Sequence, residues 1–328
     1  MPTVDLGSPS AAADLDAACR AIGFMQITGH GVEPAVIERF VTAATAFFDL
    51  SVDEKRRYVP ARRDHNRGYA ELGSEALSYS LGVDTPPDLF EAFNIGVDSW
   101  PAGDPYYEAE RDRTFCPNIW PERPAGLRAA FLEYFGAIEG LAHRISATMA
   151  RALDLDPDFF ADKTDRAVNT LRAINYQRRA GDPDPVEGQM RMGAHTDYGI
   201  LTVLLADPVP GLQIVGPDDA WHDVQPAPGA FLVNLGDALA VWTNDRWRST
   251  LHRVVPPPRS QDGPVRRRSF AFFHDGNLDA LMECLPTCTD AEHPPKYAPI
   301  TIGQHLINKI MGPRAMQEPV GVVQTREL

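Results

Sequence analysis

The chain has 328 residues, of which 44% are hydrophobic, and this is enough apolar material for a sizeable buried core. Its 45 acidic residues outnumber its 31 basic residues, and the formal charge of -14 disfavours binding to nucleic-acid phosphates or to an anionic membrane surface. We therefore expect a small-molecule partner, and neither nucleic acid nor membrane.

Location is suggested by the N-terminal residues and the cysteines. The start, MPTVDLGSPS, lacks the basic segment and apolar core of a signal peptide, and no apolar run reaches the length of a membrane span. The four cysteines are scattered and too few for a disulfide scaffold. We expect a cytoplasmic protein, and the sequence does not define its oligomeric state.

Helices are predicted for the first part of the chain, residues 1–165. Their ranges are 10–21, 33–48 and 125–153, and the third has an apolar face with a three- and four-residue repeat that includes Leu127, Phe131 and Ile138. Residues 55–122 are rich in Pro, Gly, Tyr and Asp and have poor periodicity. We predict long loops there, which cover a site.

Short strands are predicted between residues 166 and 300. Turn-separated β-type runs follow one another: LRAINYQ, ILTVLLAD, LQIV, WHDV, AFLVNLGD, LHRVV and RRRSFAFF. This series is typical of a mainly antiparallel sandwich or jelly roll with helices packed outside. A helix at about 301–312 opens the C-terminal segment, 301–328, and the three segments are expected to form one integrated domain.

A metal site is predicted from two histidines and an aspartate. His195 and Asp197 are separated by one residue, so on an extended strand both side chains leave the same face and can chelate one ion. His252, in the run STLHRVV, is the best candidate for a third ligand. Two imidazoles and one carboxylate on one side of an octahedral ion leave the opposite positions open, which suits oxygen-activating Fe(II).

An arginine and a serine near the end of the strand series predict a carboxylate site. In the run Arg266-Arg267-Arg268-Ser269-Phe270, alternation places Arg267 and Ser269 on one strand face and the other two arginines on the opposite face. A guanidinium and a hydroxyl together can hold a carboxylate, so a dicarboxylate cosubstrate fits this pair.

These motifs resemble the isopenicillin N synthase-like family of Fe(II)- and 2-oxoglutarate-dependent oxygenases, over nearly the whole chain. The stretch GFMQITGHG at residues 23–31 resembles the family's opening strand and turn, and FEAFNIG at residues 90–96 resembles its middle motif. The more specific matches are GAHTDYG at residues 193–199, GLQI at 211–214, PGAFLVNLGD at 228–237 and WTNDRWRSTLHRVV at 242–255.

The resemblance implies a double-stranded β-helix core, mainly β with flanking helices. It implies iron on His195, Asp197 and His252, and the distal carboxylate of 2-oxoglutarate on Arg267 and Ser269. Tyr176 matches a family position near the cosubstrate, and we expect Arg172 to assist it. Gln177 and Arg178 stand where prolines are frequent in plant relatives, so this strand departs from the commoner plant pattern.

The implied activity couples oxidative decarboxylation of 2-oxoglutarate by O2 to oxidation of a small organic substrate. Hydroxylation is the expected outcome, in secondary metabolism, and iron performs the difficult step, so no separate acid or base is assigned. Tyr198, Arg191, Phe272 and Tyr69 are the candidates for contact with the substrate.

Other readings stay open at this point. An Fe(II) oxidase of the same fold, ring-closing or ethylene-forming, could use the Arg267 and Ser269 pair for another carboxylate. A non-catalytic sensor of small acids would need no turnover, and a zinc hydrolase would accept the same ligand types. The sequence identifies neither the substrate nor the oxidative outcome.

Overall fold

The computed structural model describes residues 1–62, 65–83, 85–178, 184–257 and 265–315. One β-sheet consists of β1 (Thr3–Asp5), β2 (Phe24–Thr28), β3 (Gly68–Ala70), β4 (Glu91–Gly96), β5 (Thr170–Arg178), β7 (Leu201–Ala206), β10 (Phe231–Leu235) and β12 (Val265–His274). A second sheet consists of β6 (Met192–His195), β8 (Leu212–Val215), β9 (Trp221–Asp223) and β11 (His252–Val254). The short strands β13 (Leu281–Met282) and β14 (Ile300–Thr301) pair with each other.

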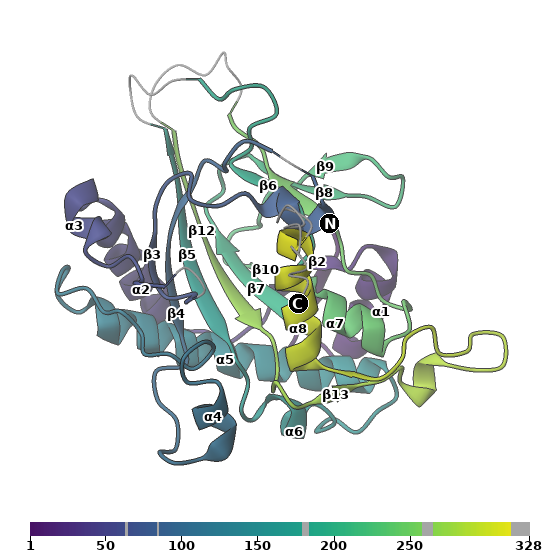
Figure 1. Ribbon diagram of the computed structural model, residues 1–328. Coiled ribbons are helices and arrows are strands. Elements are labelled where there is room, and N and C mark those ends of the chain that lie inside the picture. The colour runs from purple at the N-terminus through teal and green to yellow at the C-terminus, as the bar shows by residue number, and fades with distance from the viewer. Residues whose placement is uncertain (63–64, 84, 179–183, 258–264, 316–328) are drawn as a thin grey trace, which may run out of the picture.

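The two larger sheets enclose a shared interior, as Figure 1 shows. Their orders are β1-β2-β10-β7-β12-β5-β4-β3 and β6-β11-β8-β9. One buried cluster joins Ile174 and Tyr176 of β5 to Leu212, Ile214 and Val254 of the smaller sheet. This arrangement confirms the predicted jelly-roll core with flanking helices.

The predicted strand runs are confirmed as β5, β7, β8, β9, β10, β11 and β12, because turn residues separate these β-type runs in the sequence. Within the described residues the strand pairs are antiparallel apart from β1 and β2, which pair in parallel. Along β12, Arg267 and Ser269 face the interior, whereas Phe270 and Phe272 pack on the helical side. The strand thus separates a polar interior row from an apolar outer row.

The helices are α1 (Ala11–Ala21), α2 (Pro34–Phe48), α3 (Val52–Arg56), α4 (Pro105–Ala109), α5 (Leu127–Ala152), α6 (Ala161–Thr164), α7 (Asp237–Trp242) and α8 (Ile302–Ala315), with 3-10 turns η1 (Leu77–Leu81) and η2 (Pro286–Cys288). Of these, α1, α2 and α5 pack together against the outer face of the larger sheet. The predicted apolar face of α5 is buried from Leu127 to Met149. Phe40 of α2 stacks on Tyr134 of α5 with ring centroids 3.9 Å apart, and Phe40 packs edgewise on Phe270 of β12. In the described residues, no helix is long and apolar enough to cross a bilayer.

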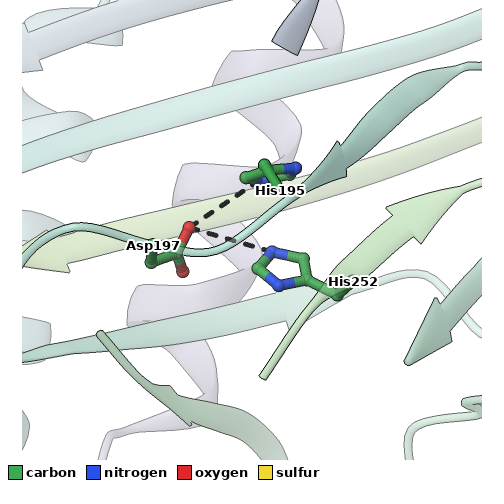
Figure 2. Close-up of side chains that lie close together, drawn as sticks. All are labelled: His195, Asp197 and His252. Carbon is green, nitrogen blue, oxygen red and sulfur yellow. Dashed lines mark ion pairs between the residues drawn. The ribbon is translucent and has the colours of Figure 1, made fainter. Parts of the chain in front are cut away.

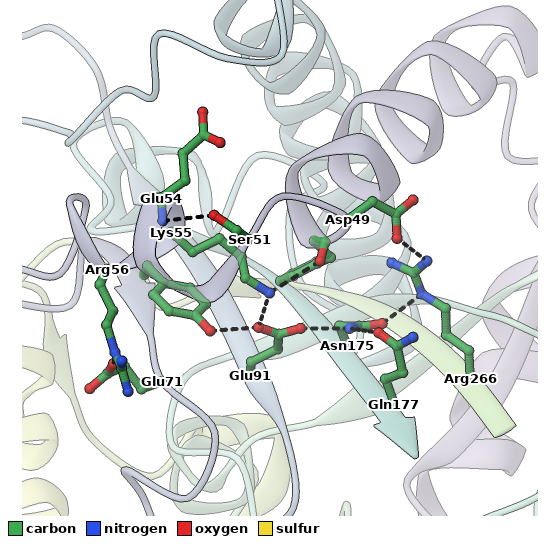
Figure 3. A network of polar contacts seen from close by, with 12 residues as sticks. Asp49, Ser51, Glu54, Lys55, Arg56, Glu71, Glu91, Asn175, Gln177 and Arg266 are labelled. Atoms are coloured by element: carbon green, nitrogen blue, oxygen red, sulfur yellow. Dashed lines mark hydrogen bonds and ion pairs between the residues drawn. The ribbon is translucent and has the colours of Figure 1, made fainter. Parts of the chain in front are cut away.

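The region 55–122 is more ordered than its composition predicts, because it contributes β3 and β4 to the larger sheet. Every residue of β4 is buried, so this strand has no alternation of polar and apolar residues to reveal it. Glu91, its first residue, accepts hydrogen bonds from Lys55 (2.6 Å), Tyr69 (2.6 Å) and Asn175 (2.8 Å), as Figure 3 shows. This buried network fastens α3, β3, β4 and β5 together.

Candidate active site

His195, Asp197 and His252 converge on one point between the two sheets (Figure 2). His195 ends β6, and His252 begins β11 directly opposite it in the strand register. Asp197 lies in the turn after β6, where its Oδ1 is 3.7 Å from His195 Nε2 and 3.8 Å from His252 Nε2. One ligand atom of each side chain lies within 4.8 Å of the other two.

Both imidazoles have their Nε2 atoms free to bind a metal. His195 Nδ1–H donates to the Gly193 carbonyl at 2.8 Å, and His252 Nδ1–H donates to the Thr250 carbonyl at 3.0 Å. Because a carbonyl can only accept, each Nδ1 carries the proton and each Nε2 keeps its lone pair. Burial, with the neighbouring His252, lowers the pKa of His195 to about 4, so its ring is neutral near pH 7.

Asp197 is prepared as a ligand by two hydrogen bonds on the oxygen that faces away from the histidines. Its Oδ2 accepts from Thr202 Oγ1 at 2.5 Å and from Asn234 Nδ2 at 2.6 Å. Burial alone raises the pKa of Asp197, but the two histidines and these hydrogen bonds bring the pKa below its usual value. The carboxylate is therefore ionised and its Oδ1 is left for an ion.

The turn that carries Asp197 is held from α7 and α8. The Asp237 amide donates to the Asp197 carbonyl at 2.8 Å, and the Asp237 carboxylate accepts from Thr196 and forms an ion pair with Lys309 at 2.6 Å. His305 of α8 contacts the Tyr198 carbonyl through Nε2 at 3.0 Å. Helix α8 thus contacts the segment that carries Asp197, both directly through His305 and through Asp237.

Arg267, Ser269 and Tyr176 meet inside the sandwich, on facing positions of β12 and β5. Arg267 pairs with Tyr176 in the strand register, and its guanidinium lies 5.2 Å from the Tyr176 ring centre. Burial raises the pKa of Tyr176, while the Arg267 charge and a hydrogen bond to Ser269 act against this rise. Arg267 is 1% exposed, and its Nε and Nη1 have no partner among the described residues.

The two other arginines predicted for the site lie at different places. Arg172 donates to Glu75 at 2.8 Å, stands over the Phe90 ring, and its charge lowers the pKa of His195. Arg191 lies at the start of β6 and is buried close enough to Arg267 for the Arg267 charge to lower its pKa. Arg172 therefore lies toward the metal ligands and Arg191 toward Arg267.

Two of the four substrate candidates do not face the interior, and those assignments are corrected. Phe272 is fully buried against Phe135 of α5, because alternation turns it to the face opposite Arg267 and Ser269. Tyr69 is buried between β4 and α2, and it donates to Glu91 instead of covering the site. Tyr198 is half-buried in the metal loop, beside Asp197.

Sequence reasoning missed the residues that orient the ligands. Asn234 offers a signal, since an amide inside the apolar run FLVNL must find a buried partner. Asp88 accepts from the Gly193 amide at 3.0 Å and holds β6, yet nothing in the loop around it marks that role. Thr202 is equally inconspicuous, because threonine is common in strands.

Two family models match parts of this chain. A family model described as the 2OG-Fe(II) oxygenase superfamily matches residues 169–276, and one described as the non-haem dioxygenase in morphine synthesis N-terminal matches residues 1–123. A 2-oxoglutarate-Fe(II) type oxidoreductase, hxnY, from Emericella nidulans is 38% identical over 87% of this chain and 79% of its own.

Solved structures share the whole architecture. A full-length Neurospora crassa protein in complex with alpha-KG superposes with a TM-score of 0.81 at 27% identity, over 95% of this chain and 96% of that one. The same protein in complex with alpha-KG and thymine gives a TM-score of 0.81 at 26% identity, with equal coverage.

Proposed function

Because this chain belongs to the 2OG-Fe(II) oxygenase superfamily and is a 2-oxoglutarate-dependent dioxygenase, we propose that its iron and cosubstrate are held by the residues that converge between the two sheets. In this proposal His195, Asp197 and His252 bind Fe(II), and Arg267 with Ser269 binds the distal carboxylate of 2-oxoglutarate. The observation that carries it is the buried guanidinium of Arg267, whose Nε and Nη1 lack partners in the described structure.

The residues present fit both groups. Two Nε2 lone pairs and one carboxylate oxygen face a common point, which is the donor set that favours Fe(II) with open positions. A buried guanidinium without a carboxylate is unfavourable, and a dicarboxylate would supply the missing acceptor. Tyr176 lies beside Arg267, and its hydroxyl is 3.6 Å from Met192 Sδ of β6.

When bound, iron and 2-oxoglutarate supply the oxidant by oxidative decarboxylation, which yields succinate and CO2. The chain's own residues orient and shield that chemistry. Gly193 and Thr250 carbonyls fix the ring planes of the two histidines, and Thr202 with Asn234 fixes Asp197. Phe24 of β2 packs edgewise on the His252 ring at 6.0 Å and keeps water from that side.

We further propose hydroxylation of a small organic substrate that approaches beside Tyr198, in secondary metabolism. The half-buried position of Tyr198 next to Asp197 supports this approach. We also propose one integrated structural domain, supported by the pairing of β2 with β10 and of β4 with β5. A cytoplasmic location is also proposed, because the cysteines of the described segments form no disulfide with one another.

Succinate formation tests the proposed cosubstrate role. The purified protein, given Fe(II), O2 and 2-oxoglutarate, should form succinate even without its own substrate, at a slow uncoupled rate. Arg267→Met should require far more 2-oxoglutarate, whereas Arg266→Met, which alters the outward arginine paired with Asp49, should not. Equal cosubstrate requirements in both variants would overturn the assignment of Arg267.

A further inference from the structure

Arg191 and Arg267 form a pair of buried cations. They are 3% and 1% exposed, and Arg191 Nη2 lies 3.5 Å from the carbonyl oxygen of Val265, which stands two residues before Arg267 on the same face of β12. Arg266 and Arg268 on the outer face of β12 have carboxylate partners in Asp49 and Asp207. Across the described ranges, neither Arg191 nor Arg267 has such a partner, so this pocket carries excess positive charge.

The guanidinium of Arg191 lies at the end of the sandwich away from the metal ligands. The Arg191 amide donates to the Val254 carbonyl at 2.9 Å, and its Nη2 reaches the Val265 carbonyl at 3.5 Å. A Cβ placed on Gly211 would lie 3.9 Å from Arg191 Nη1. Arg191 is thus surrounded by the end of β11 and the starts of β8 and β12, whereas His195 and His252 lie at the other ends of β6 and β11.

This arrangement costs free energy unless an anion is present. Arginine does not lose its proton in proteins, and buried charges are normally paired. Burial, with the charge of Arg267, lowers the pKa of Arg191 to about 10, which still leaves it a cation at neutral pH. Arg191 Nη1, Arg267 Nε and Arg267 Nη1 are buried nitrogens with no partner in the part of the chain that is described. One carboxylate, with about four acceptor positions, could satisfy all three.

We propose that Arg191 is a second guanidinium for the distal carboxylate of 2-oxoglutarate, so that two arginines close the far end of the cosubstrate pocket. This inference rests on the proposed function, in which Arg267 binds that carboxylate. It assigns Arg191 to the cosubstrate instead of the substrate, and it makes Arg191 a determinant of the preference for 2-oxo acids with two carboxylates.

Binding titrations with two matched ligands test this proposal. Dissociation constants are measured anaerobically on the Fe(II)-loaded protein for 2-oxoglutarate and for 2-oxopentanoate, which has the same carbon chain without the distal carboxylate. Arg191→Met should raise the dissociation constant for 2-oxoglutarate by about tenfold or more, which corresponds to the loss of a charge-assisted hydrogen bond. The dissociation constant for 2-oxopentanoate should not change. Arg266→Met is the control, since it removes an arginine from the outer face, and it should alter neither constant.

Melting temperatures of the protein without metal and ligand separate this role from a structural one. Replacing an unpaired buried cation by Met should leave the melting temperature equal or higher, and should reduce the rise that 2-oxoglutarate produces. The role of Arg191 would be overturned if Arg191→Met lowered the melting temperature and weakened the binding of both ligands equally. It would also be overturned if the dissociation constant for 2-oxoglutarate did not change. If Arg191→Met does not fold, Arg191→Lys keeps the charge and should weaken only 2-oxoglutarate, by a smaller factor.

Arg267→Met distinguishes the two levels of the proposal. If Arg267→Met weakens the binding of 2-oxoglutarate and Arg191→Met does not, only the role of Arg191 as a second guanidinium is excluded. If neither variant changes the constant for 2-oxoglutarate, the assignment of the cosubstrate pocket itself is wrong.

Discussion

His195 and His252 lie directly opposite each other on paired antiparallel strands, with their ring centroids 4.3 Å apart. Both rings donate from Nδ1 to a backbone carbonyl two residues earlier in the chain, so both present Nε2 to Asp197. This symmetry follows from the backbone, because the same local hydrogen bond fixes each tautomer. The two Nε2 atoms and Asp197 Oδ1 therefore face one common point.

The two hydrogen bonds to Asp197 Oδ2 should matter for iron affinity. Thr202→Val removes the 2.5 Å bond while keeping the shape of the side chain, and we expect a loss of about 10–100-fold in Fe(II) affinity, as is typical for outer-shell partners. Competition with a metal-sensitive dye under nitrogen would measure it. The control is Thr164→Val in α6, whose hydroxyl bonds only to a helix carbonyl; equal affinities in the two variants would contradict this role of Thr202.

The buried ion pair of Lys55 and Glu91 should be important for folding but not for chemistry. Lys55→Met leaves the Glu91 carboxylate buried without its cation, and we expect a loss of about 3–5 kcal/mol in the free energy of unfolding, measured with urea. The exposed pair of Arg39 and Glu133 provides the comparison, because Arg39→Met should cost at most about 1 kcal/mol. If Lys55→Met changed the free energy of unfolding as little as Arg39→Met, the buried network in Figure 3 would not stabilise the fold as proposed.

Asp275 predicts a pH dependence of stability in the metal-free protein. Burial and then the Asp197 charge raise the pKa of Asp275 to about 7, above its value in an unfolded chain. A carboxyl with a raised pKa favours folding below the unfolded pKa of about 4, and this contribution is lost as pH rises through 7. Asp275→Asn should therefore melt at a higher temperature than the parent at pH 8, and the difference should shrink at pH 5. An equal difference at both pH values would argue against a protonated Asp275.

Much of this fold follows from sequence, because alternation and turn residues locate the β-strands of the core one by one. The convergence of His195, Asp197 and His252 was also predicted, since the first two are separated by one residue and His252 completes a known donor set. Phe272 was misplaced although alternation from Arg267 and Ser269 already puts it on the opposite strand face. Tyr69 was misplaced because residues 55–122 were predicted as covering loops, whereas β3 pairs with β4 in the larger sheet. The position of Arg191 near the start of β12 could not be predicted, because it arises only when segments distant in the sequence come together.

The visible spectrum of the protein without oxygen tests the central assignment most directly. Fe(II) and then 2-oxoglutarate are added to the metal-free protein, alongside Asp197→Ala and Arg267→Met. We predict a charge-transfer band of a chelated 2-oxo acid that needs both components, is absent in Asp197→Ala, and needs far more 2-oxoglutarate in Arg267→Met. Iron binding without such a band, or a band that appears at the same 2-oxoglutarate concentration in all three proteins, would contradict the placement of iron and cosubstrate between the two sheets.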